Sequence, residues 1–89
     1  MPYIEPDRRV HFDELAERVV ILLKEDTARG DLNYFFFRVI YLWLKHIGLS
    51  YRHMQDYIHG TLDSCKMEMW WRLMRPYEDE AIHRNGDIL

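Results

Sequence analysis

The chain has 89 residues, and 12 Lys and Arg against 15 Asp and Glu give it a formal net charge of −3 at pH 7. It has no overall positive field, which disfavours bulk binding of nucleic acid. Hydrophobic residues make up 48% of the sequence and aromatic residues 15%, which is too rich for a disordered chain. The sequence predicts one folded domain, residues 1–89, with more apolar surface than a small core can hold.

Cysteine content and hydropathy bear on where the protein works. Cys65 is the one cysteine, so an intrachain disulfide and a thiolate metal site are both excluded, and a reducing cytoplasm fits best. The longest apolar run, Tyr34 to Leu44, is interrupted by Arg38 and falls short of the roughly 20 residues that span a bilayer. We therefore expect a cytoplasmic protein with no membrane-spanning segment and no secretion signal.

The first helix is expected after an extended arm. Pro2 and Pro6 both lie in residues 1–10 and predict that these residues are extended. Apolar residues then recur at helical spacing and predict an amphipathic helix ending near Thr27, before Gly30. These apolar residues are Phe12, Leu15, Val19, Leu22 and Leu23.

The second predicted helix is apolar on nearly every side. Asp31 is of the type that caps helices, which predicts a helix from near Leu32 to about His46, ending at Ile47 and Gly48. Within it only Asn33 and Arg38 interrupt the apolar residues before the basic end. A helix that is hydrophobic all round must be covered all round.

The third predicted helix begins after Ser50 as its N-cap and passes through Gly60 as one continuous helix, although a kink there stays open. Pro76 is expected to end it near Met74 and to begin a short fourth helix that stops at Gly86. The third helix has an apolar stripe with steps of three and four, formed by Tyr51, Met54, Ile58, Leu62, Cys65, Met69 and Leu73.

These elements predict an all-α fold, a small bundle of three main helices plus a short C-terminal helix. Two neighbouring helices cannot cover a second helix that is apolar all round, so we expect a homo-oligomer in which this helix also faces a copy of itself. The alternative is a compact monomer with large residues in its core. Whether residues 1–10 swap between chains is left open, as is the number of subunits.

Arginines beside tryptophans form the first candidate ligand site. Glu68 and Arg72 are four residues apart on a helix, which is the spacing of an intrahelical ion pair. Alternatively Arg72 and Arg75 bind an anionic ligand, with a base stacked on the neighbouring Trp70 or Trp71. Interface anchoring would equally explain the tryptophans.

A second candidate is the segment GDLNY, residues 30–34. A helix N-terminus can bind phosphate, but the carboxylate of Asp31 occupies that position and would repel an anion. Asp31 is therefore interpreted as a helix cap. Asn33 and Tyr34 remain as contacts to a sugar or a base.

Metal and catalytic sites have little support. Asp56 and Asp63 flank His59 at helical spacing but lie seven residues apart, roughly 10 Å along a helix axis, so both cannot reach one ion. Consecutive carboxylates at residues 78–80 point in different directions, and complementarity to the helix dipole explains them. No catalytic arrangement of Ser, Cys, His and Asp is apparent. We expect no metal, no cofactor and no enzyme.

Several segments carry a family resemblance: MPYI at the start, GDLNY, GLSY, residues 60–72, and PYEDE followed by NGD. Together they resemble a family of short uncharacterised proteins found in bacteria, archaea and their phages. The resemblance implies that these polar segments go together as parts of one family pattern. Occurrence on phage genomes suggests, by analogy, an oligomeric sponge that captures nucleotide signals of host immunity without cleaving them.

The functional hypothesis is a cytoplasmic homo-oligomer that captures a small anionic ligand derived from a nucleotide. Arg72 and Arg75 are assigned to phosphate, Trp71 or Tyr34 to stacking, and Asn33 to a polar contact. The alternative is a helical interaction module or inhibitor that binds another protein and no small molecule. A metal-dependent nucleotide enzyme comes third.

Overall fold

The computed structural model describes residues 3–89, and this part of the chain is helical, with no strand. The all-α prediction is therefore confirmed. By its internal contacts the chain divides into two units, residues 2–53 and residues 54–89, and each is described by itself. The expectation of a single domain stays a prediction.

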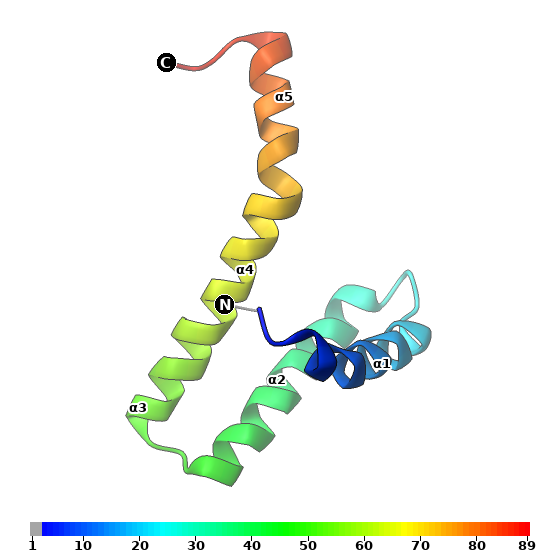
Figure 1. Ribbon diagram of the computed structural model, residues 1–89, viewed down its shortest axis with the longest axis vertical. Coiled ribbons are helices and arrows are strands. Elements are labelled where there is room, and N and C mark those ends of the chain that lie inside the picture. Colours follow the sequence, from blue (N-terminus) through cyan, green and yellow to red (C-terminus); the bar gives the residue numbers. More distant parts are fainter. Residues whose placement is uncertain (1–2) are drawn as a thin grey trace. The chain divides into compact units, whose positions relative to one another are not determined.

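The first unit contains α1 (Pro6–Leu22), α2 (Ala28–Ile47) and the start of α3 (Tyr51–Met54). A short loop joins α1 to α2 (Figure 1). The extended arm predicted for residues 1–10 is wrong from Pro6 onward, because Pro6 is the first residue of α1. Proline suits that position, where its missing N–H costs no hydrogen bond. Residues 1–2 of the arm lie outside the described residues.

The junction between α1 and α2 differs from the sequence prediction. α1 ends at Leu22, and Thr27 precedes α2 as its N-cap residue. Gly30, expected to end the first helix, lies inside α2 without a positive φ. Asp31, expected as the N-cap, lies in the first turns of α2, where its Oδ2 accepts a hydrogen bond from the Thr27 hydroxyl at 2.8 Å. Both residue types cap helices, and Thr27 takes the position.

The end of α2 and the start of α3 match the prediction. Gly48 has φ of 110°, and its N–H donates to the Leu44 carbonyl at 2.8 Å. Ser50 caps α3, since its Oγ accepts from the N–H of His53 at 3.1 Å. The His53 Nδ1 also lies 2.8 Å from the Gly48 carbonyl oxygen. These contacts define a tight connection of three residues, 48–50.

The second unit is one long helical run that α3 leads into (Figure 1). It comprises the π-helical segment η1 (Gln55–Leu62), α4 (Asp63–Met69), the π-helical segment η2 (Trp70–Met74) and α5 (Arg75–Asn85). The predicted continuity through Gly60 is confirmed. The predicted break before Pro76 is wrong, because the expected fourth helix continues directly from the third.

The wide turn of η2 explains why the helix passes Pro76. In a regular α-helix a proline ring meets the carbonyl four residues earlier, here that of Arg72. Arg72 lies in η2, where hydrogen bonds reach five residues and the turn is wider. The helix then ends as predicted at Gly86, with φ of 86° and an N–H that donates to the Ile82 carbonyl at 2.7 Å.

Burial within residues 3–89 is slight. Leu44, on α2, is the one buried residue there, with 3% of its surface exposed. The three consecutive phenylalanines of α2 are all exposed, Phe37 by 67%. In residues 54–89 no side chain is buried. The described chain thus shows large apolar residues without the core that composition alone leads one to expect.

Candidate functional site

An apolar groove runs between α1 and α2. One part of it has a volume of about 410 Å³ and is lined by side chains from both helices that carry no polar group. These are Phe12, Leu15, Ala16, Val19 and Val20 of α1 with Leu32, Phe35, Phe36 and Val39 of α2. The residues of the predicted first-helix stripe therefore do lie on one face, but that face is only partly covered.

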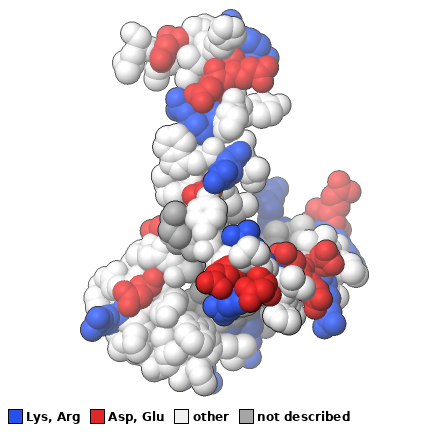
Figure 2. Space-filling model, viewed as in Figure 1, with Lys and Arg blue, Asp and Glu red and all other residues white. Residues whose placement is uncertain are grey.

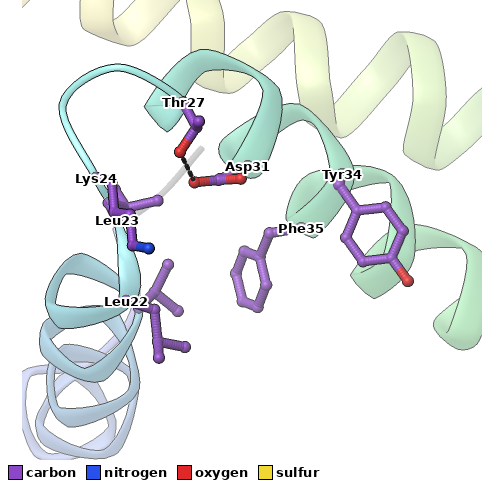
Figure 3. Close-up of a pocket in the computed structure, with 8 residues that line it drawn as sticks. Leu22, Leu23, Lys24, Thr27, Asp31, Tyr34 and Phe35 are labelled. Atoms are coloured by element: carbon purple, nitrogen blue, oxygen red, sulfur yellow. Dashed lines mark hydrogen bonds between the residues drawn. The ribbon is translucent and has the colours of Figure 1, made fainter.

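The groove continues toward the loop, where it gains polar groups. This second part, of about 580 Å³, shares Val19 and Phe35 with the first. In Figure 3 Leu22 and Phe35 face one another across it, and the hydrogen bond from Thr27 to Asp31 lies at its loop end. The remaining lining residues are Leu23, Lys24 and Tyr34. The groove thus has apolar walls, with polar side chains only at the end near the loop.

Aromatic side chains also occupy other faces of α2. Phe37 and Tyr41, one turn apart, stack with their ring centroids 6.0 Å apart, and Lys45 Nζ lies 5.6 Å from the Tyr41 ring. Trp43 and His46 form a further pair at 5.6 Å. These neighbours along one helix do not remove the aromatic faces from solvent.

In the second unit, aromatic and charged side chains meet at η2. The indoles of Trp70 and Trp71 pack edge to face with centroids 5.2 Å apart. The guanidinium of Arg75 lies 5.7 Å from the Trp70 ring and forms an ion pair with Asp79, Nη2 to Oδ1, at 2.7 Å. Both partners of Arg75 lie on its own helix, so the cation is held close to its surface.

The predicted intrahelical pair between Glu68 and Arg72 is confirmed, with Arg72 Nε donating to Glu68 Oε1 at 3.1 Å. The Arg72 side chain remains 69% exposed. An exposed pair of this type holds its partners weakly, so it leaves Arg72 able to exchange a carboxylate for another anion.

The five predicted ligand residues fall into two groups. Trp71 and Arg72 lie in η2 and Arg75 begins α5, so these three share two helical turns of the second unit. Asn33 and Tyr34 lie on α2 in the first unit, and both are exposed. Tyr34 also lines the polar end of the groove. The groups belong to different units, and a joint site stays a prediction.

Charge and metal-ligand patterns within residues 3–89 are unremarkable. Acidic and basic side chains are interspersed on the face seen in Figure 2. Among the described residues, no three His, Cys, Asp or Glu side chains come together as a metal site. None of the helices described combines the length and apolarity needed to cross a membrane.

Residues 1–88 match the family model described as Domain of unknown function (DUF6899). The chain belongs to this family. No curated protein and no solved structure matches it. The DUF6899 description assigns no chemistry, so a function for this chain must be argued from its own residues.

Sequence reasoning missed the α1–α2 groove. The α1 stripe was recognised, but the predicted start of the second helix near Leu32 removed a full turn from α2. That turn, with the loop before it, supplies Thr27 and Asp31 at the polar end of the groove. The pattern that could have located it is Thr27 followed by Asp31, two cap-forming residues one helical turn apart.

Proposed function

We propose that this DUF6899 protein is a helical interaction module that works as a homo-oligomer, with copies of the chain covering its apolar helix surfaces. The observation that carries the proposal is that, among residues 3–89, Leu44 alone is buried and many large apolar side chains are exposed. Large apolar patches that remain exposed mark sites of association in soluble proteins. The single cysteine fits the cytoplasm expected from the sequence.

The long helix of the second unit supports this proposal most directly. Taken by itself, a single helix cannot bury its own apolar stripe, and helices gain most of their stability from packing that face. Exposed apolar residues extend along this helix: Ile58, Leu62, Met67, Met69, Trp71, Leu73 and Met74. A helix from a second copy of the chain would cover this surface.

The residue types at η2 also favour an interface. Trp, Met and Arg are enriched where proteins associate, and Trp and Arg account for many of the residues that dominate binding energy. Trp71 is 58% exposed, next to the Trp70 ring that Arg75 covers. An aromatic side chain supported in this way can enter a pocket on a partner with little loss of conformational freedom.

Native mass spectrometry with two matched charge variants tests the module. Wild-type protein should appear at a multiple of 11.0 kDa. Leu73→Glu places a charge on the exposed apolar stripe and should shift the protein toward the single chain. Arg84→Glu, on α5 beyond that stripe, should leave the mass unchanged. A wild-type protein found only as a single chain would contradict the proposal.

Capture of a nucleotide-derived anion is the second candidate. Its support is the exposed indole of Trp71 beside the exposed guanidinium of Arg72, with Arg75 one turn further on. A base can stack on such an indole, and arginine forks suit phosphate. Asn33 and Tyr34 of another chain would then complete the site in the assembly. Each arginine already has a carboxylate neighbour, which places this candidate second.

The second candidate is tested by adding linear and cyclic nucleotides to the protein during native mass spectrometry. Binding predicts an assembly that gains the mass of one nucleotide in whole-number steps. Arg72→Ala and Arg75→Ala should weaken that binding, whereas Arg84→Ala should not. Unchanged nucleotide affinity in both variants would remove these arginines from the site.

A further inference from the structure

The polar end of the α1–α2 groove offers an apolar space beside a cation. Its walls are Leu22, Leu23 and Phe35, and Lys24 stands at its edge (Figure 3). Within residues 3–89 no carboxylate forms an ion pair with Lys24, and Asp31, which also lines this end, accepts a hydrogen bond from Thr27 through one of its two oxygens. A complementary segment would therefore combine aliphatic side chains with one carboxylate.

Residues 86–89 have this composition. Gly86 takes φ of 86° and ends α5, so the chain leaves the helix as Asp87, Ile88 and Leu89. Ile88 and Leu89 are large apolar residues that the structure leaves exposed. The backbone N–H of Leu89 donates to Asp87 Oδ1 at 3.2 Å, which leaves the other carboxylate oxygen for a partner.

We propose that residues 86–89 of a second copy of the chain dock in the polar end of the α1–α2 groove. Ile88 and Leu89 of one copy enter between Leu22 and Phe35 of the other, and Asp87 faces Lys24. The hollow of about 580 Å³ holds two aliphatic side chains, and the charges are opposite in sign. This inference rests on the proposed self-association and names one of its contacts.

The contact joins two different surfaces of the chain, so it is head to tail. A head-to-tail contact leaves one free groove and one free tail, and repetition closes into a ring or continues as a filament. This property separates it from a two-fold contact, in which both copies use the same surface.

A charge exchange tests the pairing of Lys24 with Asp87 in the full chain. Lys24→Glu and Asp87→Lys should each weaken association about tenfold, because each places like charges together. The double variant should recover most of the wild-type association. Lys66→Glu, on α4, is the matched control. Combined with Asp87→Lys, it should not restore association. Failure of the double variant to associate better than either single variant would overturn the pairing.

A mixing experiment tests the head-to-tail geometry. Leu22→Glu blocks the groove, and the tail variant Ile88→Glu with Leu89→Glu blocks the tail; circular dichroism should show both to be as helical as wild type. Each alone should associate more weakly than wild type, whereas their equimolar mixture should form mixed pairs through the one free tail and the one free groove. Wild-type assembly that survives both changes would overturn the inference and leave the proposed function standing. A single-chain wild type would contradict both.

Discussion

The two units differ in what covers their apolar residues. In the first unit α1 and α2 face each other across a shared groove, and Leu44 of α2 is buried. In the second unit one long helix carries an apolar stripe, and none of residues 54–89 is buried. The share of apolar residues therefore does not decide burial, since the first unit has one buried residue and residues 54–89 have none.

The difference also separates stability from association. Leu44, the buried residue of the first unit, should contribute mainly to the stability of the folded chain. Apolar residues of the second unit should contribute to association between copies, because none of residues 54–89 is buried.

Leu44→Ala should cost about 2–5 kcal/mol of unfolding free energy, because it removes buried methyl groups and leaves a cavity. Leu73→Ala, at a position 65% exposed, should cost about 0.5 kcal/mol or less at concentrations where the protein is a single chain. Urea denaturation at low and high protein concentration measures both. Equal losses for the two variants at low concentration would break the comparison.

Two glycines of the first unit should respond in opposite directions. Gly48→Ala should destabilise by about 1–3 kcal/mol, since its φ of 110° strains any residue with a Cβ. Gly30→Ala should stabilise by about 0.4–1 kcal/mol, because Gly30 is helical and a Cβ there meets nothing within 4 Å. Thermal denaturation followed by circular dichroism gives both values. Destabilisation by Gly30→Ala would instead support the helix end first expected at that residue.

These glycines also show how far the sequence could predict the fold. Gly48 and Gly86 end helices as expected, because each follows a basic last turn and precedes a change of pattern. The helix end predicted at Gly30 was wrong because Thr27 and Asp31 are both cap-forming residues, and the N-cap preference of the two residue types does not choose between them. With Thr27 as the N-cap residue, α2 gains a full turn before Leu32.

Ser50→Ala should lower the unfolding free energy by about 1 kcal/mol, because the N–H of His53 loses its cap. Ser50→Asn retains an acceptor and is the matched control, with a loss of only a few tenths of a kcal/mol expected. Both are measured by urea denaturation. If the two variants lose the same stability, the cap does not contribute as the geometry indicates.

Glu68→Gln should have the smallest effect, about 0.2–0.5 kcal/mol, because it keeps the side-chain shape and removes an exposed ion pair with Arg72. The loss should shrink as salt is raised, since exposed charges are screened. Denaturation at low and high ionic strength provides the measurement. A loss of unfolding free energy above about 1 kcal/mol that does not change with salt would show that Glu68 contributes more than an exposed ion pair does.

The candidate site was predictable only where it depends on neighbours along one helix. The spacing of Glu68 and Arg72 predicted their ion pair, and the structure contains it. The helix through Pro76 was not predicted, because proline usually ends or kinks an α-helix and the π-helical segment before it was not foreseen. The α1–α2 groove was not predictable in the same way, because it forms only where two helices pack together and no single segment of the sequence specifies that packing.

The most direct test of the account is sedimentation equilibrium of the wild-type protein over a range of micromolar concentrations. Self-association predicts a mass that is a multiple of 11.0 kDa and that falls toward a single chain on dilution. A single species of 11.0 kDa throughout that range would contradict it, since the exposed helix surfaces would then be stable in water without a partner.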